Sequence, residues 1–218
     1  AAVPLGTAPA VAVVDLVSET VTSTIPLPMG SGATGIAFVN DSIAIVANPG
    51  LNSVTSINVR AGTVGQTVDV GVYPTAVAVV GNRVFVVNGN LVNFASVGPG
   101  TVTVLDTGSL ATVTTITLTG TNPGSVAVGP DGNVYVMNSG GFAANDGSLS
   151  VIDPNGLTEI ANHTGFGDFP SPMAFGPDGT LYAASFSYGI SAWNSGTRTF
   201  ARAPGQAIEP GGTPSSAG

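Results

Sequence analysis

The single histidine and a nearby aspartate are the first candidates for chemistry in this sequence. His163 stands directly before the segment 164–169, TGFGDF, which contains Asp168. A histidine close to an aspartate could act as a general base, because its pKa lies near neutrality and a carboxylate can orient its ring. No sharp serine turn of the kind that carries a nucleophile accompanies the pair, and a histidine at a strand end usually lies on a solvated edge. We therefore assign no catalytic residue.

Amide and carboxylate side chains form a second group of candidates. Asn48, Asn88 and Asn138 each end an apolar run at a matching place in the chain, where a fourth copy has Ser185. Their oxygen atoms could hold water, a cation or a sugar. Asparagine also caps loops by bonding to nearby groups, and its recurrence in several copies favours that structural role.

Two long polar segments, 89–100 and 139–148, are expected to be loops, and long loops on a rigid scaffold often carry binding residues. Aromatic residues on these and neighbouring loops (Tyr73, Phe94, Phe142, Phe166, Phe169, Phe186 and Tyr188) could form a rim for a protein or glycan. We assign no metal site and no cofactor. The candidate ligand- or partner-binding residues are Asn88, Asn93, Phe94, Asn138, Phe142, Asp146, His163, Asp168 and Tyr188.

The elements that must position these residues are repeated hairpins. The segment 122–138, NPGSVAVGPDGNVYVMN, has two short β-branched runs around Pro130-Asp131-Gly132, which is typical of a tight strand reversal. Related segments occupy 33–48, 74–88 and 170–185. Each is followed by a third run that ends in Asn58, Asp106, Asp153 or Asn194, and then by a fourth.

The repeat predicts an all-β fold of four-stranded antiparallel meanders. Counted from Asp15, the residues that end the third strand recur at intervals of 43, 48, 47 and 41, the period of a β-propeller blade. A β-sandwich is the competing fold, but four in-phase meanders suit radial repetition better. We expect four complete blades in 31–205, the outer strands of an incomplete blade in 1–30, and a Gly/Pro/Ser-rich tail or the start of the closing blade in 206–218.

The hairpin with the S-V-I-D that follows it resembles the YVTN and NHL-like β-propeller repeats, and this resemblance covers nearly the whole chain. It implies a secreted or cell-surface propeller. Calcium-dependent lactonases and the streptogramin lyase have similar repeats. A lactonase-like calcium site would have only Asp146, Asp168, Asn88 and Asn138 as ligands here, and the expected glutamate has no match. We expect the ring to close as about five blades, one of them incomplete; the alternatives are completion by a neighbouring chain and a chain that is part of a longer protein.

Composition excludes several classes of protein. The chain has four arginines, no lysine and a formal charge of −8, so it lacks a basic surface for nucleic acid. It has no cysteine and no apolar run long enough for a membrane span. Only 7% of its residues are charged, compared with a usual ~25%, and the chain begins Ala1-Ala2-Val3, as after signal-peptide removal. We expect an extracellular or cell-surface protein.

A surface with so few charges is prone to associate with other proteins unless neighbouring molecules or glycans cover it. The favoured hypothesis is therefore a non-enzymatic structural propeller that assembles with itself into a filament or surface layer, for which strand addition at the incomplete blade is one route. The alternatives are a monomeric glycan- or protein-binding propeller and, third, a propeller lactonase or lyase.

Overall fold

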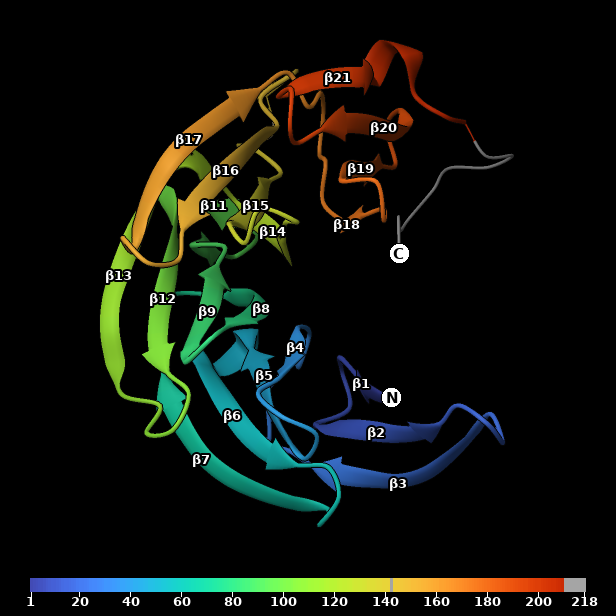
Figure 1. Ribbon diagram of the computed structural model, residues 1–218. Helices are drawn as coiled ribbons and strands as arrows, with labels where there is room; N and C mark the ends of the chain where they lie inside the picture. Colours follow the sequence, from blue (N-terminus) through green and yellow to red (C-terminus); the bar gives the residue numbers. More distant parts are fainter. Residues whose placement is uncertain (142, 210–218) are drawn as a thin grey trace. The chain divides into compact units, whose positions relative to one another are not determined.

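Antiparallel β-strands make up nearly all of the regular structure in the computed structural model, which describes residues 1–141 and 143–209 (Figure 1). Within those residues, helical structure is limited to two short turns, η1 (Pro49–Leu51) and η2 (Pro204–Gln206). No helix among them has the length and hydropathy needed to span a bilayer. Phe142 and the tail segment 210–218, both included in the sequence-based expectations, lie outside the described residues.

The contacts within the chain divide it into two compact units. The first unit comprises Ala1–Asn88 and Val102–Thr115, and the second comprises Gly89–Thr101 and Ile116–Gly218. The division passes through two strands, β12 (Pro99–Asp106) and β13 (Thr112–Thr121), so it does not follow the sequence repeats. In a repeat protein most contacts join neighbouring repeats, so the division into units need not match repeat boundaries.

The strands of the first unit form successive antiparallel sheets. The N-terminal sheet contains β1 (Ala2–Pro4), β2 (Ala10–Asp15) and β3 (Thr20–Pro26). The next contains β4 (Ile36–Phe38), β5 (Ile43–Asn48), β6 (Ser53–Asn58) and β7 (Thr63–Asp69). A third contains β8 (Pro74–Val80), β9 (Arg83–Asn88), β12 (Pro99–Asp106) and β13 (Thr112–Thr121), the last two extending into the second unit.

The second unit holds two further four-stranded sheets and a small hairpin. One sheet contains β14 (Pro123–Val128), β15 (Val134–Asn138), β16 (Ser148–Asp153) and β17 (Thr158–Thr164). The other contains β18 (Met173–Phe175), β19 (Thr180–Ser185), β20 (Gly189–Asn194) and β21 (Thr199–Arg202). The hairpin pairs β10 (Leu91–Val92) with β11 (Ala95–Ser96).

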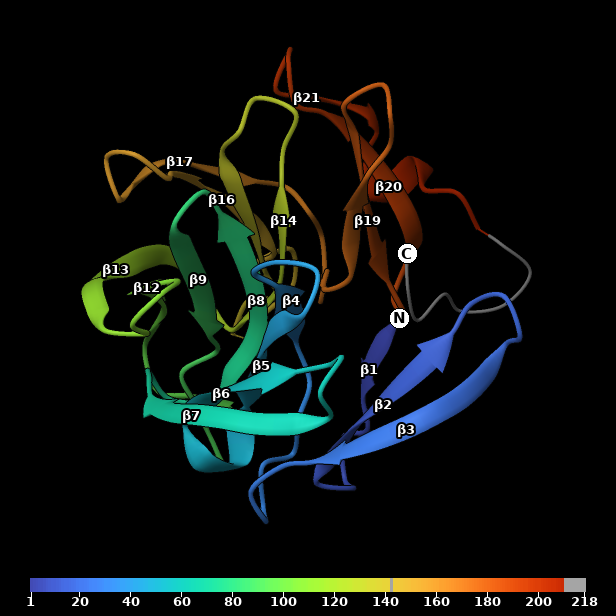
Figure 2. The ribbon, with the colours of Figure 1, turned by 60° about the horizontal axis from the view of Figure 1, so that its bottom comes forward.

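The predicted all-β fold with four antiparallel four-stranded sheets is confirmed. In each sheet the strands neighbour one another in chain order, and the third strands end at Asn58, Asp106, Asp153 and Asn194 as expected. Two outer strands are expected in 1–30, but the N-terminal sheet has a third strand, β1 (Figure 2). β1 pairs with β2, and Ala2 lies opposite Val13. The N-terminal sheet therefore has three strands, one fewer than each of the four-stranded sheets.

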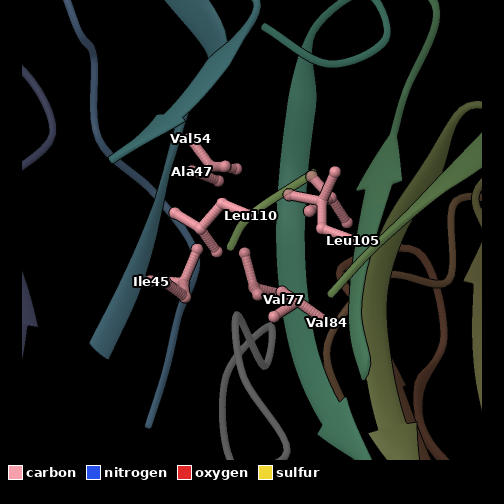
Figure 3. Packing of buried hydrophobic residues seen from close by; sticks show 8 residues of the cluster. Ile45, Ala47, Val54, Val77, Val84, Leu105 and Leu110 are labelled. Atoms are coloured by element: carbon pink, nitrogen blue, oxygen red, sulfur yellow. The ribbon is translucent and has the colours of Figure 1, made fainter. Parts of the chain in front are cut away.

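Alternation of side chains gives each central strand two buried faces. In β5, Ile45 and Ala47 pack with Val77, Val84 and Leu105 of the next sheet (Figure 3). Their neighbours Ala44 and Val46 point the other way and pack with Val11 and Ile25 of the N-terminal sheet. Apolar residues on both faces of β5 therefore stabilise contacts with the sheets on either side.

The turn before the last strand is the same in the N-terminal sheet and in the four four-stranded sheets. Its first residue is an aspartate or asparagine whose side-chain oxygen accepts backbone N–H bonds, as Asp106 Oδ1 does from Ser109 (3.0 Å) and Gly108 (3.1 Å). These bonds lower the pKa of Asp106 from its usual value. Four residues on, the backbone has a positive φ in each copy, at Glu19, Gly62, Leu110, Leu157 and Arg198. This shared geometry supports the structural role expected for the repeated acids and amides.

Candidate functional site

A cavity in the second unit is the best candidate for a binding site. It has a volume of about 360 Å³ and is lined by Asn122, Ser139, Phe169, Ser171, Pro172, Ala184, Ser185 and Phe186. These residues come from the β13–β14 connection, the end of β15, the β17–β18 connection, and the end of β19 with the residue that follows it. Small-molecule sites typically have volumes of ~300–1,000 Å³, so the cavity is large enough for a small ligand.

Two equivalent turns bring the first walls together. The segments Gly120–Pro123 and Gly167–Pro170 share a G-x-x-P pattern, and the residue before each proline, Asn122 or Phe169, has a positive φ of 51° or 50°. This left-handed residue turns the chain sharply into the next sheet. Asn122 and Phe169 consequently occupy matching positions in consecutive repeats, and both line the cavity.

Hydrogen bonds hold the walls against one another. Ser139 Oγ donates to the carbonyl of Pro170 (2.7 Å), and Ser185 Oγ donates to the carbonyl of Asp168 (2.7 Å). The hydroxyl of Ser125 donates to the carbonyl of Ser171. Each bond joins a strand, or the residue directly after one, to the 165–172 connection, so the cavity is preformed in the fold.

Two phenylalanines supply an apolar wall. The rings of Phe169 and Phe186 stack with centroids 5.6 Å apart and an interplanar angle of 13°. Phe186 remains 63% exposed. An aromatic ring held against another ring and still open to solvent provides a flat surface with little entropy left to lose on binding.

The expected acidic ligands, Asp168 and Asp146, do not line this cavity, and their carboxylates bind loop backbone instead. Asp168 Oδ1 accepts the backbone N–H of Asn145 (2.5 Å). Asp146 Oδ2 accepts those of Gly141 (2.6 Å) and Ala143 (3.1 Å). The two carboxylates thus organise loop 139–148 and its contact with the 165–172 connection. Among the described residues, no three histidine, cysteine or acidic side chains gather in a way that could hold a metal ion.

His163 packs in the second unit as part of an aromatic cluster. Its ring centroid lies 5.1 Å from that of Trp193, and its buried Nε2 has no hydrogen-bond partner within the described part of the chain. No described hydrogen bond joins it to Asp168, so the pair suggested by the sequence is not assembled as an acid–base dyad. Burial lowers the pKa of His163, and the nearby positive charge of Arg198 lowers it further.

The lowered pKa of His163 predicts a loss of stability in mild acid. The unfolded chain binds a proton at this residue as pH falls below about 6.5, whereas the folded chain takes it up only at lower pH. The free energy of unfolding should therefore fall as pH drops from about 7 towards 5. Urea unfolding at several pH values would measure this slope. His163→Phe, which keeps a ring against Trp193, should flatten it, and an unchanged slope in this variant would contradict the assignment.

The repeated asparagines donate hydrogen bonds within the sheets to which they belong. Asn138 is fully buried and its Nδ2 donates to the hydroxyls of Ser148 (3.2 Å) and Ser150 (2.8 Å). Asn88 is likewise buried and donates to Thr103 Oγ1 (3.0 Å). Neither side chain lines the cavity. The structure gives both a role in joining the second strand to the third.

Loop 89–100 contains a secondary structure that the sequence pattern did not predict. Asn93 and Phe94 form the two-residue turn between β10 and β11, with φ values of 51° and 62°. Two consecutive positive φ values are typical of a type I′ turn, for which Asn-Gly is the preferred sequence. Phe94 is 77% exposed in this turn and belongs to a different part of the second unit from the cavity lining.

Phe94→Gly is expected to raise the free energy of unfolding by about 1 kcal/mol, because glycine adopts a positive φ without steric cost and Phe94 buries little area. Phe186→Gly is the matched control. Phe186 is similarly exposed but has no positive φ, so its replacement should be neutral or destabilising. Urea unfolding of both variants would measure the difference, and a destabilised Phe94→Gly would refute the turn assignment.

The expected aromatic rim is only partly formed. Phe166 is fully buried and packs against Trp193 and Phe200, so its expected place on an exposed rim is wrong. Tyr188 is half-buried, donates its hydroxyl to the Phe166 carbonyl (2.6 Å) and has its pKa raised to about 12 by burial. Only Phe169 and Phe186 of this group line the cavity.

Most of the polar lining was not anticipated from the sequence. Asn122, Ser139 and Ser171 lie directly beside prolines or strand ends and resemble ordinary turn residues. The repeated G-x-x-P pattern is the one local signal that could have placed Asn122 and Phe169 at equivalent turns. The convergence of these turns on one cavity depends on how the sheets pack.

Comparison with known proteins supports the fold only. No family model matches the sequence, and no curated protein matches it. Among solved structures, Kuenenia stuttgartiensis hydrazine synthase is 18% identical with a TM-score of 0.69, over 84% of this chain and 55% of that one. A Bacteroides caccae protein of unknown function is 13% identical with a TM-score of 0.65, over 92% and 70%. This chain thus spans about half of the hydrazine synthase chain.

Proposed function

We propose that this chain is a non-enzymatic β-propeller module that binds a small uncharged ligand in the cavity of the second unit. The observation that carries the proposal is the chemistry of the lining, which combines an aromatic pair, an amide and three hydroxyls with no titratable side chain. Pockets that recognise ligands without reacting with them combine apolar walls with a few fixed polar groups in this way.

The propeller assignment is supported by the order of the sheets. Each four-stranded sheet is a meander whose strands neighbour one another in sequence order, and consecutive sheets share a hydrophobic core within each unit. Radial repetition of such meanders is the defining feature of propeller blades. Negative-stain electron microscopy of the purified protein should show a disc with a central depression, and an elongated two-layer particle would contradict the assignment.

The non-enzymatic interpretation is supported by the contacts of the best acid–base candidates. The carboxylate of Asp168 accepts a loop N–H, and the ring of His163 packs against Trp193. Neither residue lines the cavity. His163 and Asp168 therefore do not form an acid–base pair within the described residues.

A cavity-filling variant tests the binding function. Saturation-transfer NMR with a mixture of uncharged small molecules should give signals with the unaltered protein that disappear in Ser171→Phe, which places a ring in the cavity. Ser18→Phe, at an exposed turn of the first unit, is the control and should keep them. Signals that persist in Ser171→Phe, or no signals from the unaltered protein at millimolar ligand, would overturn the proposal.

Self-assembly is the second candidate function, and the surface of the N-terminal sheet and its flanking turns favours it. Leu16, Val17, Val21 and Met29 are 73%, 96%, 60% and 82% exposed there. Leu16 and Val17 lie in the turn between β2 and β3, and Val21 lies at the start of β3, so this end of the hairpin exposes apolar side chains of the kind that mark contacts between proteins. β1 is short and ends in Pro4, which has no N–H to donate, so β1 is a poor edge for the addition of a strand from another chain. We therefore expect a second copy to bind through the exposed apolar side chains.

Light scattering at increasing concentration tests this candidate. The mass should rise with concentration, and Val17→Asp combined with Met29→Asp should abolish the rise because charged groups resist burial. A monodisperse monomer at high concentration would reject it. Both candidate functions suit an extracellular or cell-surface protein, which is the location we propose.

A further inference from the structure

We infer that the ligand of the second-unit cavity is a neutral sugar ring that packs against the Phe169–Phe186 pair, an inference that rests on the proposed binding function. The two parallel rings offer a flat apolar wall, and Phe186 keeps 63% of its surface exposed. An exposed phenylalanine at a cavity wall is costly to leave in water. The C–H face of a pyranose is a flat partner of matching polarity for such a ring.

The polar part of the lining suits the hydroxyls of the same ring. Within the described residues, the side chains of Asn122 and Ser171 make no hydrogen bond, although both line the cavity. An asparagine carboxamide offers two donors and an acceptor, and a serine hydroxyl offers one donor and two acceptor sites. These groups can bond to sugar hydroxyls, which also both donate and accept.

The remaining lining hydroxyls add acceptors. Ser139 Oγ and Ser185 Oγ donate their protons to backbone carbonyls, and Ser185 Oγ also accepts the N–H of Ser187 (3.0 Å). Ser139 Oγ therefore keeps lone pairs that can accept a donor from the ligand. A ligand rich in O–H groups can form hydrogen bonds with these lining side chains, whereas a purely apolar ligand would leave them without partners.

Charge selects against acidic ligands. No arginine lines the cavity, the carboxylate of Asp168 lies next in sequence to Phe169, and the whole chain carries a formal charge of −8. A phosphate or a uronic acid would lose hydration without gaining a cationic partner. The preferred sugars are therefore neutral.

A nucleobase is the competing flat ligand, and the arrangement of the two rings leaves it only the exposed face of Phe186 for stacking. Bases bind best where they stack on an open ring face or insert between two rings. Phe169 and Phe186 already stack on each other, so a base cannot insert between them. Three of the four polar side chains in the lining are serines, whose single hydroxyls suit the hydroxyls of a sugar better than the paired donors and acceptors along the edge of a base.

The test is a panel of neutral sugars (glucose, galactose, mannose and N-acetylglucosamine) measured by saturation-transfer NMR and titration, with glucuronic acid and uridine as comparisons. At least one neutral sugar should bind, Phe186→Ala should weaken it about tenfold, and Phe186→Trp should retain it. Phe94→Ala, which removes a similarly exposed phenylalanine from another loop, is the matched control and should bind as the unaltered protein does.

The outcomes separate this inference from the proposed function. If uncharged fragments bind in a manner lost in Ser171→Phe but no neutral sugar binds or displaces them, the sugar inference is wrong and the binding function stands. Preference for uridine or glucuronic acid, or equal sugar binding by Phe186→Ala, also overturns the sugar inference. If neither fragments nor sugars bind, both proposals fail.

Discussion

Trp193→Ala is expected to lower the free energy of unfolding by about 3–5 kcal/mol, the usual cost of truncating a large buried aromatic residue. Trp193 is 2% exposed at the centre of the second unit, and its ring meets those of Tyr135 (6.3 Å), His163 (5.1 Å) and Phe166 (6.2 Å). Alanine would leave a cavity between two sheets that strand pairing keeps from collapsing. The rings of Tyr135, His163 and Phe166 would each lose the side chain that all three contact.

Far-UV circular dichroism during urea unfolding is the appropriate measurement, because Trp193 is the only tryptophan and its loss removes the fluorescence signal. In a protein of this size the change corresponds to a fall in Tm of roughly 2–4 °C per kcal/mol. Trp193→Phe, which keeps part of the ring stack, should lose less than half as much. Equal losses in the two variants would show that the stack does not determine the effect.

Gly120→Ala is expected to cost about 2–4 kcal/mol, because it combines overpacking with damage to a buried hydrogen-bond network. A Cβ at this position would lie 2.3 Å from Cγ and Nδ2 of Asn138. Asn138 cannot move away without losing its bonds to Ser148 and Ser150. The same relation recurs in the first unit, where a Cβ on Gly71 would lie 2.6 Å from Asn88 Cγ.

Thermal and urea unfolding of Gly120→Ala measure this prediction, with Gly205→Ala as the control. A Cβ on Gly205 would meet no heavy atom within 4 Å, and the residue has no positive φ, so its replacement should be neutral. If Gly120→Ala were equally neutral, the buried role of Asn138 would be in doubt and the ligand-binding interpretation of the repeated asparagines would regain support.

The local elements of the fold were predictable because their causes are local. The β-branched runs, the Asp-Gly reversal at Asp131 and the acids that begin each outer turn act over a few residues. They predicted the ends of the third strands at Asp106 and Asp153. Strand starts are set less locally: β7 begins at Thr63, where the strand pairs with Asn58 at the end of β6.

Side-chain environment was much less predictable than strand position. Phe166 and Phe169 stand three residues apart in one connection. The G-x-x-P pattern places Phe169 at a turn, but no local pattern indicates which of the two rings is buried. The structure buries Phe166 against Trp193 and places Phe169 on the cavity wall beside Phe186. The difference arises from contacts with β20 and with the end of β19, which lie far along the chain.

The sequence by itself determined the repeating antiparallel meander, the chemistry of its turns and the near absence of charge, since each depends on composition and short-range spacing. Tertiary structure decided which of the many polar and aromatic loop residues meet. It brought Asn122, Ser139, Phe169 and Phe186 to one cavity and turned His163 and Asp168 to separate structural contacts. Such convergence depends on the packing of one sheet against the next, which joins residues that no local pattern relates.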